Sequence, residues 1–260
     1  MKTVAGMKAE PEPIKAAAAA FRILRDLGFP HPREIDLKDL AMDRNVLVRE
    51  GDMKGAEGRL LRKKNSGVIH IRKGINPEGR RRFTIAHELG HWELHEKYSQ
   101  FLCNAEDMRD YGRSPLEVEA NHFAAELLMP GSHFKAACGN REPSLELIES
   151  LAAEFETTLT ATAIRYADAT KRKVVVVWFE AGVIRWSYNN AKSGAPYVVA
   201  GRKPPAFSSA TLPLEELDSG MAHYDDADWF PQIEWSKDGV QEETKRMPKL
   251  NAGLTLLWIP

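Results

Sequence analysis

The chain has 260 residues, a formal net charge of −1 at pH 7 and 28% charged residues. This length suits one large domain or roughly two to three small ones. The charge balance excludes a global positive field that would attract nucleic acid. Only two cysteines, Cys103 and Cys138, are present, which excludes a disulfide framework and leaves open whether the two pair. Because no apolar run approaches the ~18 residues of a membrane span, we expect a cytoplasmic protein.

The N-terminal part reads as scaffold. Residues 1–12 predict a flexible tail, and Pro13 begins a helix that ends near Gly28. A short second helix is expected over residues 37–42, with Asp36 as its N-cap.

Three short strands are predicted next, at residues 45–49, 58–64 and 68–72. The turn at Asn65-Ser66-Gly67 is typical of a hairpin joining the last two. Alternating apolar residues make the strand at 68–72 half-buried, and we expect its edge to accept an extended peptide by strand addition.

The central motif is His87-Glu88-Leu89-Gly90-His91, an H-E-x-x-H pattern in a helical setting. Two imidazoles four residues apart lie on one face of a helix, so both can bind a single zinc ion. Glu88 is placed to act as a general base on metal-bound water. A five-residue pattern also occurs by chance, so the prediction depends on a third ligand.

Candidates for that ligand follow the motif: His95, Glu96, Glu117, Glu119 and His122. On a straight helix His95 would lie ~12 Å from His87, at ~1.5 Å per residue, so both cannot reach one ion. The metzincin pattern also fails, because it requires Gly in place of Leu94 and His in place of Lys97.

A downstream helix offers a better ligand. Ser114 is its expected N-cap and Pro115 its first residue. Helical spacing places Glu117 and Asn121 on its inner face and Glu119 on a polar one. Glu117 is therefore the predicted third ligand, although Ser114-x-x-Glu117 is also a capping box. Asn121, one turn later, could orient a histidine ligand.

The runs F-T-I-A-H-E-L-G-H at residues 83–91 and E-V-E-A-N-H-F-A-A-E-L-L-M-P at 117–130 resemble the ImmA/IrrE family of metallopeptidases. The spacing from Glu117 to Asn121 is similar to that of gluzincins, which usually carry Asp at the second position. The resemblance implies a zincin-like fold and Zn²⁺, with Mn²⁺ as a substitute activating ion. It also implies a helix-turn-helix repressor as substrate, whose cleavage derepresses stress or DNA-damage genes.

Two amphipathic helices are predicted at residues 144–155 and 159–170, a pair of helix-turn-helix size. Direct DNA binding is one interpretation of this pair. Acidic residues outnumber basic ones there, so we favour packing or substrate docking instead.

Strands are predicted at residues 173–179, 183–188 and 253–259, which gives the C-terminal part an α+β character. The resemblance implies a GAF-like sensor domain here, although no motif identifies a ligand. The predicted α+β chain thus comprises a zincin-like peptidase domain at 13–140, a helix-turn-helix-like region at 141–172 and a GAF-like domain at 173–260.

The sequence predicts a zinc endopeptidase with His87, His91 and Glu117 as ligands and Glu88 as general base. The strand at 68–72 would align the substrate. Its rival is a DNA-binding transcriptional regulator with a structural or vestigial metal. Further pocket candidates, including the group that stabilises the oxyanion, are each also explained by a structural role: His70, His95, Tyr98 and His122.

Overall fold

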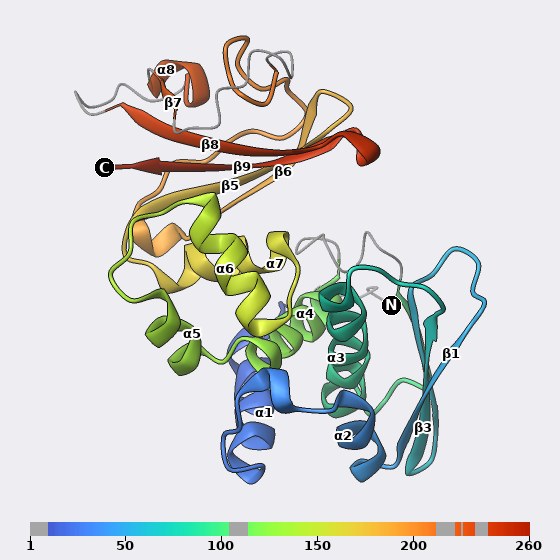
Figure 1. The fold of residues 1–260 in the computed structure, drawn as a ribbon. Coiled ribbons are helices and arrows are strands. Elements are labelled where there is room, and N and C mark those ends of the chain that lie inside the picture. The colour runs from blue at the N-terminus through green and yellow to red at the C-terminus, as the bar shows by residue number, and fades with distance from the viewer. Residues whose placement is uncertain (1–9, 104–113, 212–221, 225, 232–238) are drawn as a thin grey trace, which may run out of the picture. The chain divides into compact units, whose positions relative to one another are not determined.

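The computed structural model describes residues 10–103, 114–211, 222–224, 226–231 and 239–260 (Figure 1). The chain divides into two compact units. The N-terminal unit comprises Met1–His133 and Glu154–Thr158, and the C-terminal unit comprises Phe134–Ala153 and Leu159–Pro260. The finer division into three domains stays a prediction.

The N-terminal unit packs helices beside a four-stranded sheet (Figure 1). Its helices are α1 (Pro13–Asp26), α2 (Leu37–Asp43), α3 (Glu78–Leu94) and α4 (Pro115–Leu128). Its strands are β1 (Val46–Gly51), β2 (Gly58–Lys63), β3 (Ser66–Arg72) and β4 (Gln100–Cys103). In the sheet order β1-β3-β2-β4, β1 runs parallel to β3, and both β3 and β4 run antiparallel to β2.

Local signals explain most of these elements. The Asp36 carboxylate accepts hydrogen bonds from the backbone N–H of Lys38 and Asp39, at 2.7 and 3.2 Å, so the predicted cap of α2 is confirmed. The predicted hairpin is confirmed as β2 and β3. Pro115 begins α4 as predicted, but the Ser114 side chain makes no capping hydrogen bond.

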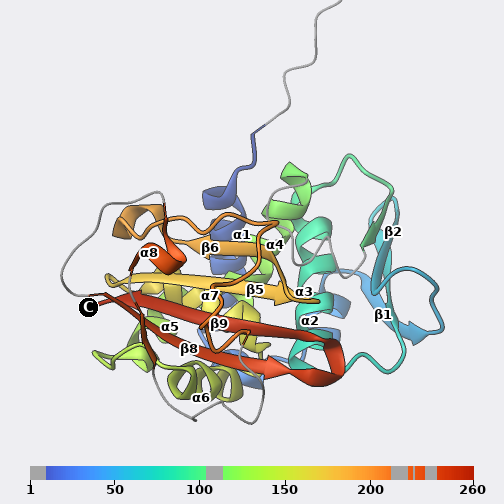
Figure 2. The same cartoon turned by 90° about the horizontal axis from the view of Figure 1, so that it is seen from above.

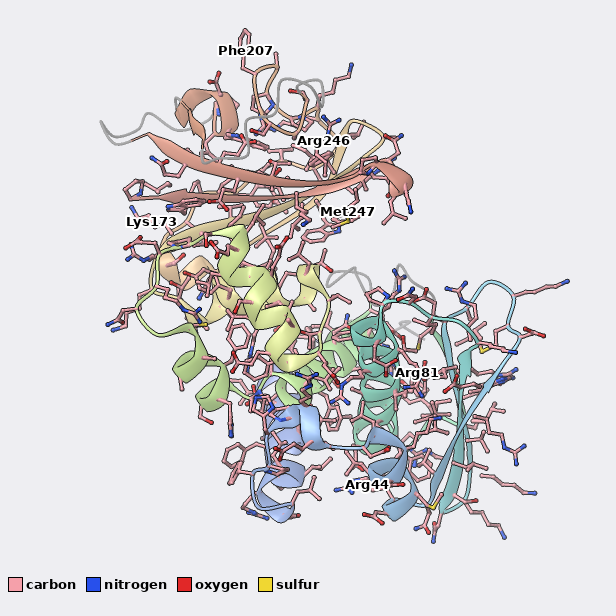
Figure 3. The ribbon with its side chains drawn as sticks, in the orientation of Figure 1. Arg44, Arg81, Lys173, Phe207, Arg246 and Met247 are labelled. Atoms are coloured by element: carbon pink, nitrogen blue, oxygen red, sulfur yellow. The ribbon has the colours of Figure 1, made fainter. Side chains whose placement is uncertain are left out.

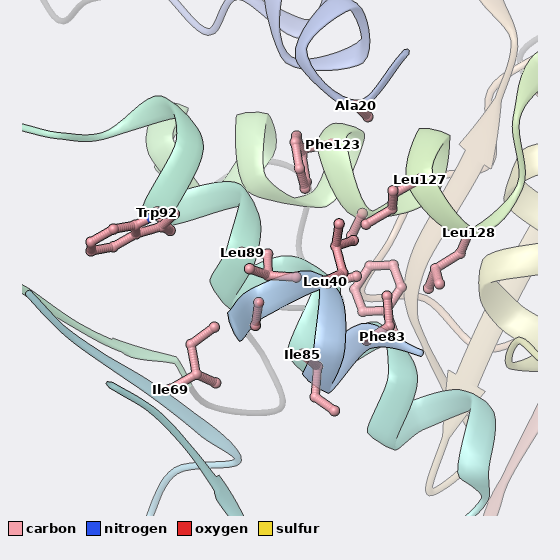
Figure 4. Packing of buried hydrophobic residues seen from close by; sticks show 14 of the residues in the cluster. Ala20, Leu40, Ile69, Phe83, Ile85, Leu89, Trp92, Phe123, Leu127 and Leu128 are labelled. Atoms are coloured by element: carbon pink, nitrogen blue, oxygen red, sulfur yellow. The ribbon is translucent and has the colours of Figure 1, made fainter. Parts of the chain in front are cut away.

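One core joins the helices to the sheet (Figure 4). Ile69 of β3, Leu89 of α3 and Phe123 of α4 are each at most 1% exposed. Helices α3 and α4 approach closely at Gly90, where a Cβ would lie 3.1 Å from Ala120 Cα. Two small residues therefore bring the inner faces of these helices together.

The strand order corrects one prediction. We expected the strand at 68–72 to offer its edge to a peptide, but β3 is hydrogen-bonded to β1 on one side and to β2 on the other. Among the described residues, the edges of the sheet are β1 and β4. Any strand addition therefore requires one of those two.

The C-terminal unit combines helices with a five-stranded sheet of order β6-β5-β9-β8-β7 (Figure 2). Its strands are β5 (Lys173–Glu180), β6 (Val183–Asn189), β7 (Ala222–Tyr224), β8 (Val240–Met247) and β9 (Ala252–Ile259). The remaining α-helices in the described part of the chain are α5 (Gly131–Cys138), α6 (Leu145–Phe155), α7 (Leu159–Ala169) and α8 (Asp226–Trp229).

Residues predicted as strands at 173–179, 183–188 and 253–259 form β5, β6 and β9, and α6 and α7 match the predicted helix pair. Helix α7 packs on β5 and β6. All eight residues of β9 are buried, which fits its central place in the sheet. The chain is thus an α+β protein, while a GAF-like identity for this sheet stays a prediction. Within the described residues, no helix has both the length and the apolar character needed to cross a membrane.

Candidate metal centre

Helix α3 carries the central motif on its buried side. His87, Glu88 and His91 are all 0% exposed. Their positions within one turn place both imidazoles on the face that meets α4.

Helix α4 brings Glu117 to the two histidines. Its Oε2 lies 3.0 Å from His87 Nε2 and 3.4 Å from His91 Nε2, and the two Nε2 atoms are 3.1 Å apart. The carboxylate therefore meets the histidines, and the Ser114 side chain makes no capping bond. The capping-box alternative for this pair is thus disfavoured.

The far nitrogens of both imidazoles have protein partners. His87 Nδ1 lies 2.9 Å from Asn121 Oδ1. His91 Nδ1 lies 2.9 Å from His95 Nδ1, and His95 Nε2 lies 2.9 Å from Glu119 Oε2. Such contacts fix ring orientation and leave each Nε2 to face the centre of the cluster.

Cys103, at the end of β4, also joins this cluster, although no sequence pattern selects it. Its Sγ lies 3.5 Å from His91 Nε2. The four donor atoms of His87, His91, Cys103 and Glu117 all lie within 4.8 Å of one another. No disulfide joins Cys103 to Cys138.

Glu88 lies beneath β2 at a position that only glycine allows. A Cβ on Gly58 would lie 2.2 Å from Glu88 Oε1. Neither carboxylate oxygen has a hydrogen-bond partner of ordinary geometry among the described residues. Burial raises the pKa of Glu88 to about 7, although the His87 charge and the Cys103 thiol favour the ionised form.

Burial and the mutual contacts of the histidines with the Glu117 carboxylate also shift the pKa values of the predicted ligands. Burial lowers the pKa of His91 to about 3, which keeps its imidazole neutral. Burial alone would lower the pKa of His87, but the hydrogen bond to Glu117 and the Glu88 charge raise it. Although burial opposes this, the two imidazoles hold the pKa of Glu117 well below its usual value. Glu117 is thus ionised at neutral pH.

This donor set suits a zinc ion. Imidazole nitrogen, carboxylate oxygen and thiolate sulfur are its usual protein ligands. The buried carboxylate of Glu88 beside them has no ordinary hydrogen-bond partner in the described chain, as expected of a group that acts on a bound species.

A family comparison agrees with this arrangement. Residues 41–166 match the model of peptidase family M78, described as "IrrE N-terminal-like domain". This stretch of the chain is similar to that domain. The matched range contains α3, β4 and α4, and so the whole donor cluster of this IrrE-like domain.

Two further comparisons concern the whole chain. A solved structure titled "Mycobacterium tuberculosis transcriptional regulator" aligns with 94% of this chain and 76% of that chain. Its TM-score is 0.58 at 16% sequence identity, which shows a shared fold alone. No curated protein matches the sequence.

Two further predicted pocket residues of the IrrE-like domain, Tyr98 and His70, lie outside the donor cluster. The Tyr98 ring is centred 6.5 Å from that of His95, and Tyr98 is 48% exposed. His70 lies on β3 against Gly51 and is not a member of the donor cluster found among the described residues. Both stay predictions as pocket residues.

The arginine run before the motif proves to be structural. Arg80 donates a hydrogen bond to the buried Glu57 at 2.9 Å, and Arg81, which is labelled in Figure 3, donates one to Glu50 at 2.7 Å. Arg82 is 8% exposed and donates to the Pro32 carbonyl at 2.7 Å. Each of the three arginines therefore has a carboxylate or carbonyl partner within the protein.

Proposed function

We propose that the IrrE-like domain is a zinc-dependent endopeptidase that cleaves a helix-turn-helix transcriptional repressor. His87, His91 and Glu117 would hold the ion, and Glu88 would be the catalytic base. Bound zinc would polarise the scissile carbonyl and acidify a water molecule, and Mn²⁺ could replace it. The observation that carries the proposal is the meeting of three ligand atoms within 3.4 Å beside a buried glutamate.

Glu88 has the properties that proton transfer at neutral pH requires. With a pKa of about 7, its carboxylate can take a proton from water and release it to the leaving amine. Gly58 leaves its carboxylate the space that a side chain would fill. The orienting contacts of Asn121 and His95 hold the two imidazoles in the tautomer that ligation needs.

Strand β4 replaces β3 as the element that would align a peptide. It forms an edge of the described sheet, and its last residue, Cys103, lies in the donor cluster. Leu102 is 64% exposed on this strand. A substrate paired along β4 would therefore pass the buried donor atoms with its main chain extended.

The chain gives less support to the rival DNA-binding function. Helix α7 occupies the place of a recognition helix, yet it packs on β5 and β6. Of its eleven residues only Asp168 is exposed, and this residue is acidic. A helix that reads the major groove needs an exposed face with cationic or amide side chains.

The test is a cleavage assay on each purified helix-turn-helix repressor encoded beside the gene for this chain. We expect the zinc-loaded protein to produce new N-termini, detected by mass spectrometry. Glu88→Gln should slow cleavage by about 10²- to 10⁴-fold, the usual contribution of a general base. Glu96→Gln alters an exposed carboxylate eight residues along the chain and should cleave normally.

Two results would contradict the proposal. One is the same set of fragments from Glu88→Gln as from the parent, which would indicate a contaminating protease. The other is zinc binding without cleavage of any of these repressors, together with salt-sensitive, sequence-specific DNA binding, which would favour the regulator.

A further inference from the structure

Cys103 ends an edge strand with its side chain turned into the metal-ligand cluster. It is 0% exposed, and in the pairing of β2 with β4 it lies opposite Gly58. Gly58 is also the residue beneath which Glu88 fits. The sheet therefore places the thiol beside both the base and the imidazoles.

Four of the six separations between the donor atoms lie close to those of tetrahedral coordination, and all six are within 4.8 Å. Zinc bonds of ~2.0–2.3 Å at tetrahedral angles separate neighbouring ligand atoms by roughly 3.3–3.8 Å. The two Nε2 atoms are 3.1 Å apart, Glu117 Oε2 lies 3.0 and 3.4 Å from them, and Cys103 Sγ lies 3.5 Å from His91 Nε2. The thiol thus occupies one corner of a four-donor cluster.

We propose that Cys103 is a fourth protein ligand, which closes the coordination sphere of the bound ion in the resting protein. This inference rests on the metal site of the proposed function. On binding, the thiol would form a metal–sulfur bond and release its proton to solvent, with no change of oxidation state. Structural zinc sites have four protein ligands, whereas catalytic ones keep a position open for water.

A closed site makes peptidase activity conditional. The position that water needs is held by the Cys103 thiolate, so an incoming peptide must displace it. Strand β4 provides a route, because a substrate that pairs with the edge it forms in the described sheet contacts the strand that carries the thiol. The same edge would thus bind the substrate and open the site.

The simpler role of Cys103 is that of a small apolar residue, since it also belongs to the N-terminal core. Free buried cysteines commonly act in this way. The two roles differ in one respect: a core residue has no bond to the metal, and its removal leaves the metal spectrum unchanged.

The first experiment loads the full chain with one equivalent of Co²⁺ alone. We expect a sulfur-to-cobalt charge-transfer band in the near ultraviolet for the parent and for Cys138→Ser. Cys103→Ala should bind cobalt without this band. A cobalt complex of the parent that lacks the band would overturn the inference and leave the peptidase proposal intact, whereas no cobalt binding at all would overturn both.

The second experiment needs no change at Cys103. In Cys138→Ser, Cys103 is the sole thiol of the chain. We expect one equivalent of zinc to slow its reaction with a disulfide reagent by about tenfold or more, since a metal-bound thiolate reacts poorly. Equal reaction rates with and without zinc would overturn the inference.

A third measurement tests whether the site is closed. Acetohydroxamate, a small metal-binding anion, should bind the cobalt-loaded Cys103→Ala variant about tenfold or more tightly than the cobalt-loaded parent, because it need not displace sulfur. Equal affinity for the two proteins would show that the thiol does not hold the fourth position.

Discussion

Among the described residues, each unit buries one glutamate completely, and the two carboxylates differ in their hydrogen bonds. Glu88 in the N-terminal unit and Glu242 in the C-terminal unit are both 0% exposed, and burial raises the pKa of both. Glu242 accepts hydrogen bonds from Ser208 at 2.8 Å, Trp229 at 2.8 Å and Thr244 at 2.9 Å. Glu88 has no partner of ordinary geometry in the described chain.

This contrast shows which signal marks a functional site. Burial and a raised pKa are common to both carboxylates, so neither property separates them. The hydrogen bonds do, because those to Glu242 stabilise the fold, whereas Glu88 has only the Cys103 thiol beside it and keeps a desolvation cost that a bound species would relieve. The neighbouring donor atoms of His87, His91 and Glu117 indicate that this species is a metal with its ligands.

The largest expected effect comes from metal itself. Zinc at about 1,000 times its dissociation constant should raise the unfolding free energy of the N-terminal unit by about 4 kcal/mol, and a chelator should reverse this gain. Thermal unfolding with and without zinc measures it. The double variant His87→Ala, His91→Ala is the control and should not respond. If zinc raised the unfolding free energy of that variant by the same amount, the ion would not bind at His87 and His91. Glu88 would then not be distinguished from Glu242 by a neighbouring metal site.

In metal-free protein, substitutions of Glu242 and Glu88 should lower the unfolding free energy by unequal amounts. Glu242→Ala leaves three donors unpaired and should lower the unfolding free energy by about 3 kcal/mol. Glu88→Gln removes a buried charge without breaking an ordinary hydrogen bond, so its change should stay within about 1 kcal/mol of the parent. Urea unfolding followed by circular dichroism compares them. If Glu88→Gln lowers the unfolding free energy more than Glu242→Ala does, Glu88 is a structural residue.

A smaller effect is expected at Glu119, which contacts the metal cluster only through His95. Ligation through Nε2 leaves His91 Nδ1–H to donate to His95 Nδ1, and His95 Nε2–H to donate to Glu119. Glu119→Ala should weaken zinc binding about tenfold, or about 1.4 kcal/mol, in competition with a chelating dye. Glu119→Gln retains an accepting oxygen and should recover most of this loss. Equal losses in the two variants would indicate that packing alone matters.

The sequence predicted the features that depend on residues close together in the chain. Two local signals selected the predicted ligands: the four-residue spacing of His87 and His91, and the position of Glu117 on the inner face of its helix. The structure brings these three residues together. The cap at Asp36 and the hairpin of β2 and β3 were likewise local signals, and both are confirmed.

The misses are all non-local. Cys103 lies 12 residues after His91 in a strand of four residues, too short for a periodic pattern, and sheet pairing alone brings it to the cluster. The edge assigned to β3 was wrong because β1 pairs with it in parallel, and strand order is not encoded in the strand itself. The exclusion of His95 as a ligand agrees with the structure, because α3 ends at Leu94 and His95 contacts His91 Nδ1 from outside the donor cluster.

The smallest expected effect is on the pH dependence of the unfolding free energy, in which the parent with Glu242 should differ from the Glu242→Gln variant. Burial outweighs the hydrogen bonds that Glu242 accepts from three side chains and from the Ser209 backbone, and it raises the pKa of Glu242 above the usual 4.5. The folded state therefore holds the proton at a pH where the unfolded state has lost it, so this contribution to stability is fully present below pH 4.5 and is lost as pH rises through the raised pKa. Glu242→Gln cannot titrate, and its amide oxygen can still accept from Trp229 while the hydroxyls of Ser208 and Thr244 turn to accept from its NH₂. Urea unfolding of both proteins from pH 4 upward should show the parent losing stability relative to the variant. A parent that gains relative stability with rising pH would mean that the hydrogen bonds outweigh burial.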